Sequence, residues 1–411
     1  MTKIKYIKRH IEKIVKECIE EYKVITVIGP RQVGKTTMLN EILGESNKYT
    51  FLTLDDLKIR NEALYDYDLF LEKYKTPLFI DEIQKAPNLF EHIKYIVDQQ
   101  DERGQFILTG SESFVLMKGV KESLSTRNVL IDMVSLSNSE IENRTNFAFV
   151  PDKYKMLERK CKPQTHLQTF KKIINGSMPN LNNGTTTNTN LFYSTYCFTT
   201  LFNDIYDDRV KIKDVNKFLL FLKVVASLVG QEVNLSNIAK LTNLNYKTVV
   251  DWLDALIAMN VIFLLHPYSN NLLKRTTKMA KLYFYDTGIP CYLMNYTDPE
   301  ILWNSEYSGH IFECYAISEI AKGYINDGRS IPLYYVQSYD KKEIDLIIEG
   351  EGGIVYPIEI KKSVTPQDKH FSNIGILKPL GNKVGPMTLI CCATEFGILK
   401  QNAYYFPVHW I

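Results

Sequence analysis

Several features that mark membrane or exported proteins are missing from the sequence. No apolar run approaches the length needed to cross a bilayer, and residues 1–12 contain basic side chains without the apolar core of a signal peptide. The seven cysteines include no C-x-x-C pair and are odd in number, which favours reduced thiols over a disulfide framework or a zinc site. We therefore expect a cytoplasmic protein without membrane contact.

An excess of charge of one sign is also missing. The 49 basic and 47 acidic side chains leave a net charge of +2, which excludes a globally basic nucleic-acid coat protein. Any contact with nucleic acid must therefore come from local patches. The length of 411 residues, 45% of them hydrophobic, predicts several domains at roughly 100–200 residues each.

The first third of the chain alternates predicted strands and helices. An amphipathic helix is predicted over 4–22, because apolar residues recur there at helical spacing. Short apolar runs then predict four strands, at 24–28, 49–54, 77–80 and 105–108. Strands that alternate with helices over such a span favour a parallel α/β sheet.

A phosphate-binding motif follows the first predicted strand. Residues 29–36 read GPRQVGKT, with a predicted helix directly after them. In this G-x4-G-K-[ST] pattern the glycines let backbone N–H groups converge on phosphates, the lysine reaches the β and γ phosphates, and the hydroxyl ligates Mg²⁺. The predicted ATP-binding residues are Gly29, Pro30, Arg31, Gln32, Val33, Gly34, Lys35, Thr36 and Thr37.

Polar residues also end the third and fourth predicted strands. Asp81 is placed to hold Mg²⁺ together with Thr36, and Glu82 is placed to orient or deprotonate the attacking water. Thr109 and Ser111 follow the fourth strand, where a sensor of the γ-phosphate would lie; a turn that caps the strand is the alternative. Together these residues predict Mg²⁺-dependent ATP binding with hydrolysis.

Six segments resemble a known family. The prokaryotic AAA-type ATPases of the AAA+ superfamily that carry a C-terminal domain of unknown function are similar in GPRQVGKTT (29–37), LDD (54–56), FIDEIQKAP (79–87), ILTGS (107–111), SLSTR (123–127) and KLYFYDTG (281–288). Thr126 departs from the family's SLxGR segment, and GSMP (176–179) only approximates its GGYP turn. The resemblance makes Arg127 a candidate arginine finger or sensor, with an ordinary surface arginine as the alternative.

The alternation of predicted strands and helices stops in the middle of the chain, and helices are predicted again after it. Residues 143–192 include a polar, turn-rich stretch and are predicted to form an irregular linker or low-complexity region. Beyond it, the predicted elements have the spacing of a helix-turn-helix with a wing: helices at 215–228, 235–241 and 246–260 and a strand at 261–265.

DNA contact by this winged helix is one of two interpretations. The third helix would read DNA, but Asp251 and Asp254 on its outward side would repel phosphates. A more basic segment follows at Lys274, Arg275, Lys278 and Lys281. The alternative is a structural lid or a protein-contact module. The D-T-G triplet at 286–288 does not indicate an aspartic protease, because no second triplet supplies the partner aspartate.

Acidic residues and a lysine recur in the last part of the chain. Glu313 lies on a predicted helix, Asp345 on a predicted strand, and Glu359 and Lys361 on the next strand. Because strand side chains alternate, the last two share a face. The spacing resembles the PD-(D/E)xK nuclease superfamily, which implies that Glu313, Asp345 and Glu359 hold Mg²⁺ beside Lys361. A salt-bridged hairpin is the alternative.

These observations predict an α/β multidomain protein. We expect a P-loop NTPase domain with a parallel sheet at 1–142, a linker at 143–192, a helical winged-helix-like domain at 193–302 and an α/β restriction-endonuclease-like domain at 303–411. ATP hydrolysis would gate an action on DNA, with nuclease activity left undecided. The alternative is a nucleotide-dependent switch that binds protein partners and carries an inactive C-terminal scaffold. A ring motor would require an oligomer, which the sequence leaves open.

Overall fold

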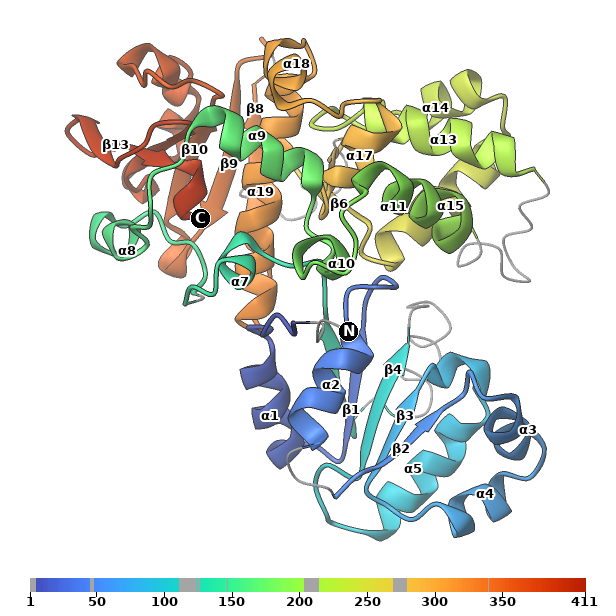
Figure 1. The fold of residues 1–411 in the computed structure, drawn as a ribbon. Helices are drawn as coiled ribbons and strands as arrows, with labels where there is room; N and C mark the ends of the chain where they lie inside the picture. The colour runs from blue at the N-terminus through green and yellow to red at the C-terminus, as the bar shows by residue number, and fades with distance from the viewer. Residues whose placement is uncertain are drawn as a thin grey trace.

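The computed structural model describes residues 5–44, 48–110, 124, 126–145, 147–202, 214–268, 279–338 and 340–411. An N-terminal α/β unit lies below the rest of the molecule in Figure 1, and the helical middle and the C-terminal sheet lie side by side above it. Sheets of five, six and two strands are present. The expected parallel α/β sheet is confirmed for the N-terminal unit.

The N-terminal sheet has five parallel strands in the order β2-β3-β4-β1-β5. Their bounds are β1 (Val24–Ile28), β2 (Thr50–Thr53), β3 (Leu78–Asp81), β4 (Phe106–Gly110) and β5 (Asn128–Asp132). All five residues of β1 are buried, since the sheet is covered on both faces. The four predicted strands are confirmed, and β5 is an additional strand.

The helices of this unit cover both faces of the sheet (Figure 1). They are α1 (Glu12–Glu21), α2 (Lys35–Gly44), α3 (Leu57–Tyr65), α4 (Tyr67–Lys73), the short η1 (Ile83–Lys85) and α5 (Leu89–Gln99). Alternate residues of β1 enter two different core clusters, with Ile25 and Val27 in one and Val24 and Ile28 in the other. The loops after β1, β3 and β4 consequently meet at one edge of a rigid sheet.

Residues 143–192 contain several helices, so this stretch differs from the irregular linker that we expected. They contain or adjoin α7 (Asn138–Ile141), α8 (Lys153–Glu158), α9 (His166–Asn175), α10 (Pro179–Asn182), α11 (Thr189–Thr195) and the π-helix η2 (Tyr196–Leu201). Thr165 and Gln168 form a capping box at the start of α9, and Asn188 caps α11. Buried Phe170 and Ile173 then hold α9 in the core.

The helical middle region contains the three predicted helices, α13 (Val215–Ser227), α14 (Leu235–Thr242) and α15 (Tyr246–Ala258). The side chains of Asn234 and Asn245 cap the second and third helices. Strand β6 (Ile262–Leu265) pairs antiparallel with β7 (Lys281–Phe284). Most of the basic segment at 274–281 lies outside the described residues, which resume at 279.

The C-terminal region begins after α17 (Gly288–Leu293) and α18 (Pro299–Asn304) with the long helix α19 (Ser308–Asn326). In Figure 1 this helix stands between the C-terminal sheet and the helical middle, and its lower end approaches α1. The six-stranded sheet has the order β12-β13-β11-β10-β9-β8. Its strands are β8 (Leu333–Gln337), β9 (Glu343–Glu349), β10 (Val355–Ile360), β11 (Met387–Cys391), β12 (Gly397–Lys400) and β13 (Ala403–Pro407).

Short 3₁₀ segments complete the C-terminal region: η3 (Glu351–Gly353), η4 (Asp368–Phe371), η5 (Ile374–Lys383) and η6 (Val408–Trp410). All seven cysteines fall within the described part of the chain, and none of them forms a disulfide. Among the helices that the structure describes, none combines the length and apolar character needed to cross a bilayer.

Candidate functional site

The loop between β1 and α2 has a backbone that requires glycine. Gly29 has φ +152°, and a Cβ atom added there would lie 1.9 Å from the carbonyl oxygen of Met133. Gly34 has φ +92° and Gln32 has φ 64°, so the chain turns back on itself within a few residues. This curled loop leads directly into the N-terminus of α2, as the motif requires.

Lys35 lies against this loop at the start of α2. Its side chain is buried, with 6% of the residue exposed. The Nζ atom donates to the carbonyl oxygens of Gly29 at 2.8 Å and Pro30 at 2.9 Å. The ammonium group is therefore held at the loop whose backbone would surround a phosphate.

Three elements meet at the carboxylate of Asp81, which ends β3. The Thr36 hydroxyl of α2 donates to Asp81 Oδ1 at 2.8 Å, and the Thr109 hydroxyl of β4 donates to the same oxygen. They meet because β4 lies between β1 and β3, and Thr109 pairs with Val27 near the end of β1. The sequence predicted this grouping. Ser111, the other sensor candidate, lies outside the described residues.

Glu82 follows Asp81 in a left-handed backbone conformation, with φ 59° and ψ 41°. This conformation is uncommon for a residue other than glycine and is enriched at functional sites. The amide of Gln84 donates to Glu82 Oε2 at 2.5 Å. The carboxylate is thus fixed directly beside the Asp81 position, and it is more exposed than Asp81.

Arg127 lies at the opposite end of the strands from the phosphate loop. It precedes β5, and its carbonyl oxygen accepts from the N–H of Val24, the first residue of β1. The phosphate loop follows the other end of β1, about 16 Å away for a strand of this length. Arg127 instead forms a bidentate ion pair with Asp98 of α5. The structure therefore places Arg127 away from the phosphate loop of its own chain.

Arg9 is a residue at the phosphate loop that the sequence reasoning missed. It is 2% exposed, and its guanidinium donates to the carbonyl oxygens of Val33 and Val134, both at 2.8 Å. Its Nε atom pairs with Glu140 Oε1 at 3.0 Å. No local pattern distinguishes this arginine from the other basic residues at the N-terminus, so only the tertiary contacts identify it.

Glu140 is the buried counter-charge of Arg9. Burial works to raise its pKa, but the charge of Arg9 and the backbone N–H groups of Ser137 and His10 outweigh this effect and lower the pKa. The carboxylate also closes a capping box with Ser137 at the start of α7. The pair therefore joins the N-terminal segment, the phosphate loop and the start of the next region.

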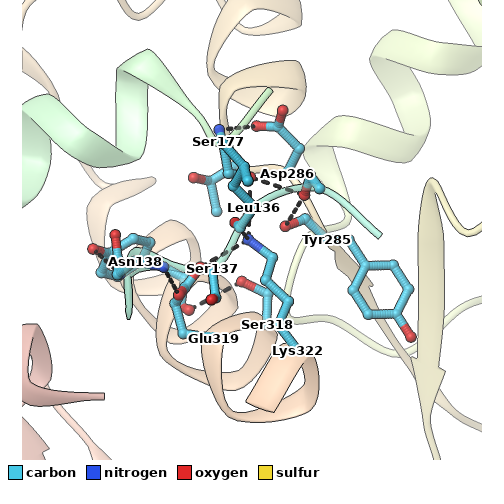
Figure 2. A network of polar contacts seen from close by, with 12 residues as sticks. Leu136, Ser137, Asn138, Ser177, Tyr285, Asp286, Ser318, Glu319 and Lys322 are labelled. Atoms are coloured by element: carbon cyan, nitrogen blue, oxygen red, sulfur yellow. Dashed lines mark hydrogen bonds and ion pairs between the residues drawn. The ribbon is translucent and has the colours of Figure 1, made fainter. Parts of the chain in front are cut away.

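Two of the family-like segments meet at Asp286, as Figure 2 shows. Asp286 Oδ1 accepts from the N–H of Gly288 at 2.8 Å and of Ser177 at 3.3 Å, and the Tyr193 hydroxyl also donates to this carboxylate. At Gly176, with φ +69°, a Cβ atom would lie 1.9 Å from the Tyr193 hydroxyl oxygen. Asp286 is thus a structural acceptor that holds the glycine turn, in agreement with the rejection of a protease site.

A second part of the same network connects the N-terminal unit to α19 (Figure 2). Lys322 is 1% exposed and donates to Glu319 Oε1 at 2.7 Å, to the Leu136 carbonyl oxygen at 3.0 Å and to the Ser177 hydroxyl at 3.1 Å. Glu319 in turn accepts from the N–H of Asn138 at 2.6 Å. The segment that leaves β5 is therefore fastened to the C-terminal region by buried polar contacts.

The C-terminal acidic cluster lies on β9 and β10. These strands pair antiparallel up to Leu346 and Ile358, so Asp345 and Glu359 occupy the next opposed position. Lys361 Nζ lies 2.7 Å from Asp345 Oδ2 and 3.2 Å from Glu359 Oε2. All three residues line a cavity of about 570 Å³. The sequence predicted that these residues would converge.

Glu313 of α19 adjoins this cluster but does not line the cavity. Its Oε1 atom accepts from the Tyr283 hydroxyl at 2.5 Å and lies 3.7 Å from Lys281 Nζ. Burial, together with the charge of Asp345, raises the pKa of Glu313 to about 7 and the pKa of Glu359 to about 9. Among the residues that the structure describes, no three Asp, Glu, His or Cys side chains are grouped so that they could hold a metal ion.

Family models match three successive parts of the chain. A model described as an AAA domain matches residues 21–142. Two models of domains of unknown function match residues 167–300 (DUF8612) and 308–410 (DUF4143).

Two curated relatives span most of the chain. The chain is 24% identical to the uncharacterized protein Rv2008c of Mycobacterium tuberculosis over 352 residues, which cover 86% of this chain and 73% of the relative. It is 25% identical to the uncharacterized protein MJ1544 of Methanocaldococcus jannaschii over 368 residues, which cover 85% and 76% of the two chains.

Among solved structures, the Walker-type ATPase of Pyrococcus abyssi is 14% identical, with a TM-score of 0.43 over 69% of this chain and 94% of that one. The RuvB Holliday junction branch migration motor of Thermotoga maritima is 16% identical, with a TM-score of 0.32 over 62% and 88% of the two chains.

The curled glycine loop, the Asp81 carboxylate and the Thr109 hydroxyl all lie inside the segment that matches the AAA domain. The parallel sheet places these three features at one edge. Residues 21–142 of this chain therefore have a P-loop NTPase fold and match an AAA domain, and matches to two domains of unknown function follow along the chain.

Proposed function

We propose that this protein binds ATP with Mg²⁺ at the loop of residues 29–36 and hydrolyses it to ADP and phosphate. The observation that carries the proposal is the convergence of the Thr36 and Thr109 hydroxyls on the Asp81 carboxylate, beside the buried ammonium of Lys35. A loop of backbone N–H groups, a cation and oxygen ligands are thereby placed at one sheet edge, which is what a magnesium triphosphate requires.

The residues present fit a magnesium ion. The Thr36 hydroxyl and the Asp81 carboxylate are oxygen donors whose atoms lie 2.8 Å apart, and Mg²⁺ prefers such oxygen ligands. In this proposal these two side chains hold the ion, directly or through water. When bound, Mg²⁺ supplies neutralisation of the charge on the β and γ phosphates.

The remaining residues have separate tasks in hydrolysis. Lys35 exchanges its bonds to the Gly29 and Pro30 carbonyl oxygens for bonds to phosphate oxygens. Glu82 orients or deprotonates the attacking water, and the Thr109 hydroxyl contacts the γ-phosphate. The loop N–H groups and the N-terminus of α2 bind the remaining phosphate oxygens.

Calorimetric titration of the full chain with MgATP and MgADP tests the proposal. Wild type should take up one nucleotide per chain, and Lys35→Ala should weaken binding by about hundredfold or more, because a buried charge partner of the phosphates is lost. Lys73→Ala is a matched control, since Lys73 lies on α4 in a surface pair with Glu62. Lack of uptake by folded wild-type protein would remove the proposed function.

A second candidate function concerns the C-terminal cluster, and the cavity that Asp345, Glu359 and Lys361 line favours it. We propose that nucleotide hydrolysis gates a metal-dependent action of this cluster on DNA. Asp345 and Glu359 would hold Mg²⁺, and Glu313 lies outside this cavity. The Lys361 ammonium lies between the two carboxylates, so it must move when a cation enters.

Binding of protein partners through an inactive C-terminal scaffold is the rival proposal. Asp345→Ala and Lys35→Ala separate the two, with DNA cleavage in MgATP and the cellular activity as readouts. Loss of activity in both variants supports the DNA enzyme. Retention of cellular activity in Asp345→Ala, with loss in Lys35→Ala, supports the switch.

A further inference from the structure

Arg9 contacts the phosphate loop from outside the matched AAA segment, which begins at residue 21. It precedes α1, yet its guanidinium reaches Val33 inside the loop and Val134 just beyond β5. Three different nitrogen atoms of Arg9 are used, because Nε pairs with Glu140 while Nη1 and Nη2 each bind one carbonyl oxygen. The planar fork of the guanidinium therefore fixes all three partners relative to one another.

The bond to Val33 determines the orientation of one peptide unit in the loop. This unit joins Val33 to Gly34. The φ angles of Gln32, just before Val33, and of Gly34 itself are both positive. In a planar trans peptide, the C=O of one residue and the N–H of the next point in opposite directions. Because the Val33 carbonyl is turned toward Arg9, the Gly34 N–H is turned away from Arg9, toward the side of the loop that would hold phosphates.

The position of Arg9 is itself rigidly set. Glu140 Oε1 also accepts from the N–H of His10 at 2.9 Å, and Glu140 Oε2 accepts from the N–H of Ser137 at 2.7 Å. The backbone N–H of Arg9 donates to Glu12 Oε1 at 2.7 Å. The arginine is thus anchored by buried contacts that do not include the loop.

We propose that Arg9 is a positioning residue for nucleotide binding: by holding the Val33 carbonyl, it keeps the Gly34 N–H directed at the phosphates before the ligand arrives. The inference rests on the proposed ATP-binding function. Preorganised donors bind an anion more tightly because the loop does not have to reorder on binding.

The test separates loop positioning from simple stability. Removing Arg9 alone leaves Glu140 buried without its counter-charge, which destabilises the fold. The informative variant is Arg9→Met with Glu140→Gln, in which neither charge remains. Lys13→Met is the matched control, because Lys13 lies on α1 with 82% of its side chain exposed. Each protein is measured for its melting temperature without nucleotide, its Kd for MgADP, and its kcat and KM for MgATP.

We expect the double variant to fold with a lower melting temperature than wild type, because buried hydrogen bonds are lost, and to bind MgADP about tenfold more weakly, with a matching rise in KM. Lys13→Met should equal wild type in every measurement. Wild-type affinity in the folded double variant would overturn the inference while leaving the proposed function intact. Absence of MgADP binding to wild type would overturn both.

Arg9→Lys keeps the test decisive if the double variant does not fold. Lysine retains the charge opposite Glu140, but its ammonium lacks the planar fork that holds both carbonyls at fixed angles. We expect a folded protein whose MgADP affinity is reduced by about threefold or more. Wild-type affinity in Arg9→Lys would overturn the inference.

Discussion

The phosphate loop and the C-terminal cluster both place a lysine beside an aspartate, but they use the pair differently. At the loop, Lys35 donates to backbone carbonyl oxygens, and Asp81 accepts from two hydroxyl groups. In the C-terminal cluster, Lys361 donates directly to Asp345 and lies beside Glu359. In the C-terminal cluster the lysine therefore pairs directly with the acid.

Strand direction explains this difference. Parallel strands end on the same side of a sheet, so the residues after β1, β3 and β4 lie next to one another. Antiparallel β9 and β10 instead place Asp345 and Glu359 opposite each other on one face. Crowded buried carboxylates raise one another's pKa, and a neighbouring lysine offsets part of that repulsion. The carboxylates of the C-terminal cluster are therefore already paired with a lysine, whereas the Asp81 carboxylate accepts from two neutral hydroxyl groups.

The largest expected effect comes from Glu82. Glu82→Gln should lower kcat for ATP hydrolysis by about 10²–10⁴-fold and leave the Kd for MgATP nearly unchanged, because an amide does not accept a proton from water. Steady-state phosphate release and calorimetry measure the two quantities. Glu91→Gln, on the surface of α5 beside Lys94, is the control. A large rise in Kd with kcat maintained would contradict the assigned role.

The second largest effect is expected for Lys322, whose buried contacts connect the segment after β5 to α19. Lys322→Met leaves Glu319 buried without its cation and removes the bonds to Leu136 and Ser177. We expect a loss of about 3–5 kcal/mol in the free energy of unfolding, measured by denaturant titration. Lys342→Met serves as the control, since Lys342 forms an exposed pair with Asp340. A loss below about 1 kcal/mol would mean that these contacts do not hold the segment and α19 together.

Glu359 should produce a pH-dependent effect on stability. Its pKa is raised to about 9, by burial first and by Asp345 second, so the folded protein binds a proton that the unfolded chain releases near pH 4.5. The stabilisation that protonated Glu359 gives the folded state is complete below pH 4.5 and is lost as the pH rises toward 9. Glu359→Gln, which mimics the protonated acid, should therefore melt higher than wild type at pH 8, by roughly 2–4 °C for about 1 kcal/mol.

Melting curves of metal-free protein in EDTA between pH 4.5 and 9 measure this difference. The gap between Glu359→Gln and wild type should widen with pH. Glu351→Gln, in the exposed turn η3, should follow wild type throughout. Parallel curves for Glu359→Gln and wild type would show that the carboxyl is not held protonated in the folded protein.

Arg127 should give the smallest effect. Its ion pair with Asp98 is partly exposed, so Arg127→Ala should cost about 1 kcal/mol or less in stability. Because Arg127 lies at the sheet edge opposite the phosphate loop, kcat for ATP should change by less than about twofold. A tenfold or larger drop in kcat at unchanged stability would mean that this arginine reaches a phosphate site, and it would have to be that of another chain.

Part of the fold could be predicted because its pattern is local. The buried parallel strands read as short apolar runs, and Asn234 and Asn245 stand where helix caps are needed. The helices of residues 143–192 were missed, because that stretch is rich in polar turn residues. Its helices are stabilised by caps such as Thr165 and by the burial of Phe170 against other helices.

The sequence also predicted only part of the arrangement at the candidate sites. The meeting of Lys35, Thr36, Asp81 and Thr109 followed from a local motif and from the rule that parallel strands end together. The location of Arg127 did not follow, because strand β5 was not recognised and its register against β1 sets where the arginine lies. The resemblance to the nuclease superfamily implied that Asp345, Glu359 and Lys361 converge, and the ion pairs of Lys361 with both carboxylates correspond to the alternative of a salt-bridged hairpin.

The sequence by itself determined the phosphate loop and the strand ends around it, since bonding within a few residues and the alternation of strands and helices specify them. Only the tertiary structure decided that Arg9 holds the loop, because its partners Val33 and Glu140 lie 24 and 131 residues away. Contacts over such separations depend on how whole elements pack, and local periodicity does not encode that packing.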